Sequence, residues 1–169
     1  MRRAIEGSGL AGSVRIVENP SDDDRDRLYA EAHVVVIPSF HEGFCRPIIE
    51  GLRAGCLAIG YDGYNLPAAI NGFGRVVRSG SVDALAEAMI DVAGSIAAVR
   101  NDPHQGVLRL DRGDLSVHDF ERAVAEYVEE FAFASVAARM RKRLKSLIEG
   151  ESVVSEDRAR RYGSSDRRS

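Results

Sequence analysis

Two glutamates, Glu42 and Glu50, are the residues whose type and spacing most clearly suggest chemistry. Seven residues separate them, beginning with a Gly-Phe-Cys turn and including Pro47, and the apolar run 34–37 precedes the pair. This order predicts a buried strand, a tight loop and the first turn of a helix. In that geometry unpaired backbone N–H groups and a carboxylate face one cleft, which suits a ligand that carries both phosphates and hydroxyls.

The strand and helix around this pair belong to an alternating pattern that runs through most of the chain. The continuous apolar run at 34–38 is typical of a strand covered on both faces in a parallel sheet. Alternating strands and helices predict an α/β fold, a Rossmann-like open parallel sheet with flanking helices. We expect strands at 14–17, 34–38, 57–60 and 75–77, and helices at 22–32, 46–54, 66–70, from 82 onward and at 116–149.

Three segments are expected along the chain. Residues 1–115 form the Rossmann-like domain and end in a loop, 116–149 form a long C-terminal helix that packs on it, and 150–169 are disordered. A break in the long helix near 133–135 is left open. For the helix that begins after Ser81, the predicted inward stripe consists of Val82, Leu85, Ala86, Met89, Ile90 and Ala93.

Composition narrows the class of protein. The chain has 169 residues, 44% of them hydrophobic and 29% charged, which is enough for one domain with a real core. It has no apolar run long enough to predict a membrane-spanning helix. Two cysteines, Cys45 and Cys56, make neither a disulfide framework nor a metal cluster, so we expect a cytoplasmic protein with reduced thiols.

Charge is unevenly distributed along the chain. Residues 1–138 carry 13 basic and 21 acidic side chains, which argues against binding to nucleic acid. Residues 139–169 carry 10 basic and 5 acidic side chains. Two alternatives stay open for this end: peripheral contact with the inner face of a membrane, or a solvated terminus, which we favour.

The motif and its neighbours together resemble a known family. The matching residues are Glu42-Gly43-Phe44, Pro47 and Glu50, followed by a glycine-rich loop at 63–67 and a turn and strand at 72–77. In this order they resemble the retaining glycosyltransferases of the two-Rossmann-domain (GT-B) architecture, family 4-like, or glycosyl transferases group 1. The resemblance covers about residues 14 to 95 and implies the C-terminal, donor-binding domain of such an enzyme.

The resemblance implies a role for each motif residue. Glu42 is the implied catalytic residue, which approaches the transferred sugar and holds a hydroxyl. The backbone N–H groups of Gly43, Phe44 and Cys45 would contact the sugar or the diphosphate, and Glu50 would accept hydrogen bonds from ribose hydroxyls. The family generally needs no metal, so we expect no cofactor beyond the nucleotide diphosphate sugar that serves as donor substrate.

The chain also departs from the family pattern. Cys45 stands where glycine is usual, Arg46 where an apolar residue is common, Gly51 where alanine is usual, and Ala68 where many members are acidic. We favour Cys45 as a small residue in a glycine position over a reactive thiol. Arg46 either grips phosphate or, as we favour, pairs with a glutamate or faces solvent.

Two functions are compatible with this sequence. The first is a retaining glycosyltransferase that moves a hexose from a nucleotide diphosphate sugar to an acceptor, with this chain supplying the donor-binding part. The family's acceptor domain, the opening strand of the donor domain and its basic diphosphate-gripping pair are expected to lie outside this chain. The second is a non-catalytic nucleotide-sugar-binding module, or a split or decayed transferase half that needs a separate acceptor-domain chain.

Overall fold

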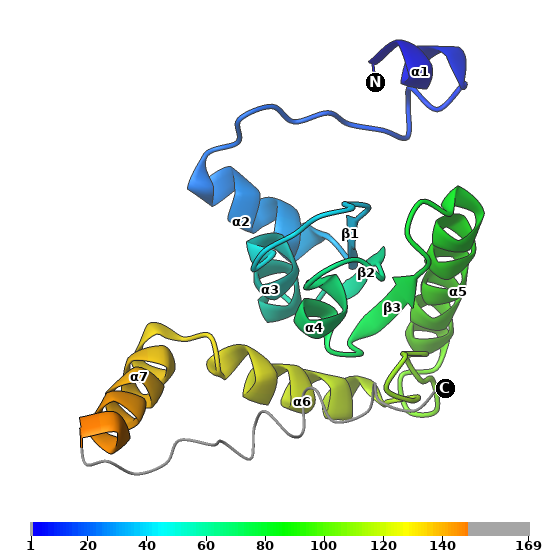
Figure 1. Cartoon of the computed structure of the whole chain (residues 1–169). Coiled ribbons are helices and arrows are strands. Elements are labelled where there is room, and N and C mark those ends of the chain that lie inside the picture. The colour runs from blue at the N-terminus through cyan, green and yellow to red at the C-terminus, as the bar shows by residue number, and fades with distance from the viewer. Residues whose placement is uncertain (1, 149–169) are drawn as a thin grey trace, which may run out of the picture. The chain divides into compact units, whose positions relative to one another are not determined.

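The computed structural model describes residues 2–148 of the chain. The chain divides into two units, Met1–Val124 and Ala125–Ser169, and each is described by itself. The elements are α1 (Arg2–Gly7), α2 (Asp22–Glu31), β1 (Val34–Ile37), α3 (Arg46–Arg53), β2 (Leu57–Tyr61), α4 (Leu66–Ile70), β3 (Gly74–Val77), α5 (Val82–Asn101), α6 (Val117–Glu129) and α7 (Phe133–Ile148) (Figure 1).

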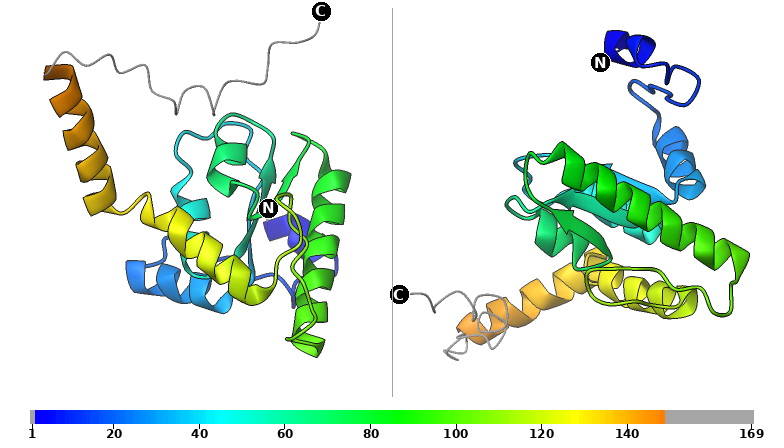
Figure 2. Two further views of the ribbon diagram at one scale, coloured as in Figure 1. Left: turned by 90° about the horizontal axis from the view of Figure 1, so that it is seen from below. Right: turned by 90° about the vertical axis from the view of Figure 1, so that its right-hand side faces the viewer.

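Three parallel strands in the order β1-β2-β3 form the sheet of the first unit. Every residue of the central strand β2 is buried, and it pairs with β1 on one side and β3 on the other. Helices α3 and α4 lie on one side of the sheet and α5 on the other (Figures 1 and 2). This is the predicted α/β, Rossmann-like open sheet with flanking helices, and a C-terminal helix follows it.

The core lies where the helices meet β2. Its fully buried members include Ile48 and Leu52 of α3, Ile59 of β2 and Val92 of α5. Beyond the sheet, the Phe73 ring packs edge-on against Phe120 of α6, with 6.0 Å between ring centroids. Burial of this apolar surface on both faces of the sheet is the main favourable term that holds the elements together.

Helix α3 approaches β1 so closely that any side chain larger than that of glycine at one position would have to displace its neighbour. A Cβ atom on Gly51 would lie 2.7 Å from Cγ1 and 3.1 Å from Cβ of Val35. Both are atoms of a stiff β-branched side chain, which cannot turn away cheaply. Glycine at position 51 therefore has a local reason, the valine beneath it.

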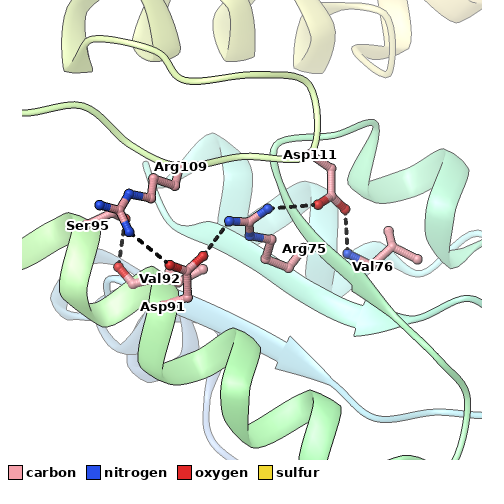
Figure 3. Close-up of polar contacts among 7 residues, drawn as sticks. All are labelled: Arg75, Val76, Asp91, Val92, Ser95, Arg109 and Asp111. Atoms are coloured by element: carbon pink, nitrogen blue, oxygen red, sulfur yellow. Dashed lines mark hydrogen bonds and ion pairs between the residues drawn. The ribbon is translucent and has the colours of Figure 1, made fainter.

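The outer edge of β3 is covered by the segment that follows α5. The backbone N–H of Asp111 donates to the Gly74 carbonyl at 3.0 Å, and the Asp111 carboxylate accepts the Val76 N–H at 2.7 Å. The same carboxylate pairs with Arg75, which also pairs with Asp91 of α5 (Figure 3). Asp111 thus takes the place of a neighbouring strand for the groups of β3 that face outward.

Two predictions about the elements differ from the structure. No strand forms at 14–17, where Val14 and Val17 are exposed, because a strand requires a paired neighbour and no strand of the described residues pairs with this segment. The long helix is two helices, since α6 ends at Glu129 and the next three residues form a tight turn with hydrogen bonds to the carbonyls three residues earlier. The expected tail at 150–169 lies outside the described residues.

The predicted inward stripe of α5 was also wrong. Its inner face is formed by Ala88, Val92 and Ser95, whereas Val82 and Ile90 of the predicted stripe are 71% and 73% exposed. The helix carries alanines and large apolar residues around most of its circumference, so apolar spacing alone did not identify the buried face.

The second unit is described here by its residues 125–148 only. Within it the rings of Tyr127 and Phe131 pack edge-on with 5.1 Å between centroids. The basic side chains of α7 are exposed: Arg139, Arg141, Lys142, Arg143 and Lys145. Among the residues described in either unit, no helix has the length and apolar character needed to cross a bilayer.

Replacing Gly51 by alanine should destabilise the fold by about 1 to 3 kcal/mol, because the added methyl overlaps Val35. The double variant Gly51→Ala, Val35→Ala should lose less stability than the two single variants added together, since the smaller residue at 35 makes room. Urea unfolding of all four proteins measures this coupling. If the loss of stability in the double variant equals the sum of the two single losses, the close approach of residues 51 and 35 is contradicted.

Candidate functional site

The loops that follow β1, β2 and β3 come together at the carboxyl edge of the sheet. A Cβ atom on Gly63, in the loop after β2, would lie 3.0 Å from the Phe40 carbonyl oxygen in the loop after β1. A Cβ atom on Gly80, after β3, would lie 3.4 Å from the Phe40 ring. The His41 ring packs edge-on against Tyr64 with 4.0 Å between centroids. Open α/β sheets bind ligands at this edge.

Asp62 ties two of these loops to each other. Its Oδ1 accepts hydrogen bonds from the Ser79 hydroxyl at 2.6 Å and from the Ser79 backbone N–H at 2.8 Å. These bonds, the hydroxyl's first, lower the pKa of Asp62 from its ordinary value. Asp62 therefore joins the loop after β2 to the loop after β3.

The first half of the motif lies in the loop between β1 and α3. Glu42 is half-buried, and its carboxylate makes no hydrogen bond or ion pair with any residue in the described part of the chain. Gly43 is exposed, and a Cβ atom added there would meet nothing within 4 Å. Phe44 is 50% exposed. The backbone at Gly43 therefore borders open space, as a site of close ligand approach requires.

Cys45 occupies a left-handed position at the start of α3. Its φ is 54° and its ψ is 60°, a conformation that glycine adopts without strain and other residues rarely adopt. Its side chain is 4% exposed, and burial raises the pKa of the thiol, with the Glu42 charge acting in the same direction. A protonated, buried thiol is a poor nucleophile, which agrees with a small residue that fills a glycine position.

Glu50 lies one turn into α3 and is held by three side chains. Its Oε1 is 2.8 Å from Nη2 of Arg46, one turn earlier on the same helix. Its Oε2 accepts the Tyr29 hydroxyl at 3.4 Å and lies 3.8 Å from Nε of Arg25. The pairing of Arg46 with a glutamate is the alternative that the sequence favoured.

Tyr29 and Arg25 were not predicted as site residues. Both come from α2, more than twenty residues before Glu50, and their spacing of four residues places them on one face of that helix. That spacing was a usable signal, but only the fold shows that this face meets α3. Burial first, and the Glu50 charge second, raise the pKa of the Tyr29 hydroxyl, so it stays protonated and able to donate.

The two motif glutamates lie only eight positions apart in the sequence but make no contact with each other in the described structure. Glu42 adjoins Cys45, whose thiol responds to its charge, while Glu50 faces α2. A shallow cavity of about 370 Å³ lies elsewhere, between β3 and α5, and includes none of the predicted site residues. Three of its charged lining residues are already paired, since Arg75 pairs with both Asp91 and Asp111. We therefore place the candidate site at the loops and not in that cavity.

Comparison with known proteins agrees with the fold. The profile of the family described as Glycosyl transferases group 1 matches residues 1–95, more than half of the chain and all of the motif. This chain belongs to that family. O-antigen chain mannosyltransferase B of Escherichia coli is 33% identical over 81 residues, which make up 48% of this chain and 21% of that protein. The chain thus matches about a fifth of the length of this curated relative.

The side chains that the structure describes were compared with the requirements of a metal site. Among residues 2–148, no three histidine, cysteine, aspartate or glutamate side chains gather closely enough to hold a metal ion together. The polar groups that gather at the loop edge are carboxylates, guanidinium groups and hydroxyls, which recognise a ligand through hydrogen bonds and charge.

Replacing Asp62 by asparagine should weaken the fold most at neutral pH. Because the fold lowers the pKa of this carboxyl, its ionised form stabilises the fold above its ordinary pKa of 3.8, and that contribution disappears as the pH falls through the lowered value. Urea unfolding of Asp62→Asn and wild type should therefore differ near pH 7 and converge on acidification. Asp114→Asn, at an exposed position, serves as control. An equal difference in the free energy of unfolding at neutral and at acidic pH would contradict the bonding of the Asp62 carboxylate to Ser79.

Proposed function

We propose that this chain supplies the donor-binding part of a retaining glycosyltransferase with the GT-B architecture. The reaction would transfer a hexose from a nucleotide diphosphate sugar to an acceptor in the cytoplasm, with retention at the anomeric carbon. The observation that carries the proposal is the turn from Glu42 to Glu50 at the carboxyl edge of the sheet, inside the region that matches the group 1 glycosyltransferases. The O-antigen mannosyltransferase relative supports a sugar as the transferred group.

The geometry supports distinct roles for the motif residues. Glu42, with no partner in the described chain, is available to accept a sugar hydroxyl. The backbone from Gly43 to Cys45 precedes α3 and borders open space beside Gly43, where the sugar or diphosphate can approach. Glu50, whose side-chain partners are Arg46, Tyr29 and Arg25, is the proposed acceptor for the ribose hydroxyls. Catalysis would rest on positioning and on stabilising the departing diphosphate.

Gly43→Ala should leave the fold intact but weaken donor binding. The added methyl meets no protein atom, and Gly43 does not have a left-handed φ. The free energy of unfolding, measured with urea, should therefore stay within about 0.5 kcal/mol of the wild-type value. The methyl should occupy the space where the ligand approaches and weaken UDP- or GDP-sugar binding at least about tenfold. Calorimetry measures the binding, and Gly94→Ala, which also meets no protein atom, is the matched control.

Glu50→Gln tests the other end of the motif in the same titrations. Loss of a charged acceptor for hydroxyl donors should weaken binding by about 1.5 to 3 kcal/mol. The exposed Glu31→Gln on α2 is the matched control. If the wild-type chain binds no nucleotide sugar at millimolar concentration, the donor-site proposal is wrong.

A specific observation also favours the second candidate, a transferase half that pairs with a separate chain. The His33 carbonyl faces β2, where it accepts the Leu57 N–H, so the alternating backbone groups of Val34 and Val36 face outward. Within the described chain no hydrogen bond reaches them, whereas the matching groups on β3 are paired with Asp111. The edge of β1 also lacks the charges and prolines that usually protect such edges. The proposed occupant is a parallel strand from a chain that carries the acceptor domain.

Amide hydrogen exchange of the chain alone should distinguish the two edges of the sheet. The N–H groups of Val34 and Val36 should exchange much faster than that of Val76, which Asp111 accepts at 2.7 Å. The N–H of Ala58, paired with the Phe73 carbonyl in the middle of the sheet, is the protected reference. Protection of Val34 and Val36 equal to that of Val76 would mean that the β1 edge is already covered, and the partner proposal would lose its support.

A further inference from the structure

Glu50 lies between an outer partner that is exposed and inner partners that hold it loosely. Arg46 contacts Oε1 at 2.8 Å from the solvent side, and its side chain is 72% exposed. On the inner side, the Tyr29 hydroxyl at 3.4 Å and Arg25 Nε at 3.8 Å are both farther from Oε2 than a good hydrogen bond allows. The carboxylate is therefore drawn toward Arg46 and away from α2.

The inner side contains a donor that is not satisfied. Arg25 Nε is buried and has no hydrogen-bond partner in the described part of the chain, although Nη1 of the same side chain pairs with Asp22 at 2.9 Å. A buried N–H without an acceptor is unusual and costs free energy. Oε2 of Glu50 lies 3.8 Å from this nitrogen, so a shift toward α2 would bring it within hydrogen-bond distance.

We propose that Arg46 exchanges partners when a nucleoside diphosphate binds: it releases Glu50 to the ribose hydroxyls and pairs with the diphosphate. This inference rests on the proposed donor site. It assigns a phosphate-binding role to a residue that differs from the family's usual apolar residue at this position, and it gives the ligand's negative charge a partner within this chain.

The exchange has little cost on the protein side. An exposed ion pair such as Arg46–Glu50 contributes little stability, so breaking it is easy. Once released, Glu50 can move toward Arg25 and satisfy its buried N–H, which compensates for the lost contact. The guanidinium of Arg46 can bind phosphate through two parallel hydrogen bonds.

The ligand's own connectivity favours the exchange. The hydroxyls that would take the place of Arg46 on Glu50 belong to the same ribose that carries the diphosphate, one methylene group beyond the ring. A guanidinium displaced from the carboxylate by those hydroxyls therefore remains close to the phosphates. A nucleoside without phosphates would displace Arg46 and offer it no new partner. Removal of the Arg46 side chain should therefore raise the affinity for the nucleoside and lower the affinity for the nucleoside diphosphate.

The test compares uridine with UDP, and guanosine with GDP, on the full chain by calorimetry. In Arg46→Gln the nucleoside should bind about twofold to fivefold more tightly, because Glu50 no longer has a competing partner. The diphosphate should bind about tenfold more weakly, because the phosphate contact is lost. Arg46→Lys should keep part of the diphosphate preference, and higher salt should reduce that preference in wild type more than in Arg46→Gln. Arg53→Gln, an exposed arginine at the end of the same helix, is the matched control.

The outcomes separate this inference from the donor site itself. If Glu50→Gln weakens binding of both ligands but Arg46→Gln leaves their ratio unchanged, the donor site stands and the exchange is wrong. If Arg46→Gln strengthens the binding of both ligands equally, Arg46 only competes with the ligand for Glu50, and the proposed exchange is again wrong. If the wild-type chain binds neither ligand, the proposed function and this inference both fail.

Discussion

The parallel pairing of β2 with a strand on each side is the constraint on which the rest of the structure depends. Because all three strands run in one direction, each is followed by a loop at the same edge, and the motif loop, the glycine-rich loop and the loop after β3 meet there. Gly74 makes the pairing possible, since a Cβ atom there would lie 1.6 Å from the Ala58 carbonyl oxygen. If β2 and β3 did not pair at that point, the loops that follow them would no longer be held side by side at the candidate site.

Helix α3 connects this sheet to the motif. Its buried face, including Ile48 and Leu52, fixes the helix against β1 and β2, and Gly51 lets it approach Val35 directly. The same turns of helix carry Arg46 and Glu50 on the side that faces away from the core. The left-handed backbone at Cys45 turns the chain sharply into the helix, so the position of the Glu42 loop and that of Glu50 are set by one short, rigid connection.

The sequence predicted the parts of the fold that depend on local pattern. Apolar runs, N-caps and glycine turns gave the parallel α/β class, the three strands β1 to β3 and the motif turn at its correct place. Features that depend on distant neighbours were missed: Val14–Val17 has strand periodicity but no pairing partner, and α5 has several apolar faces of which only the sheet selects one. Likewise Tyr29 and Arg25 join Glu50 only because α2 lies against α3, a contact that local pattern does not encode.

Four carboxylates around the candidate site and the β3 edge, those of Asp62, Asp111, Glu42 and Glu50, differ in the donors they accept. Asp62 and Asp111 accept backbone N–H groups of Ser79 and Val76, and such bonds fix one segment of chain to another. Glu50 has only side-chain partners, and Glu42 has none within the described residues. Side-chain contacts at an exposed rim can be exchanged at low cost, whereas a backbone bond that holds a loop cannot. Glutamates placed this way keep their oxygens available for hydroxyls of a ligand, while the aspartates hold in place the loops and the strand edge around them.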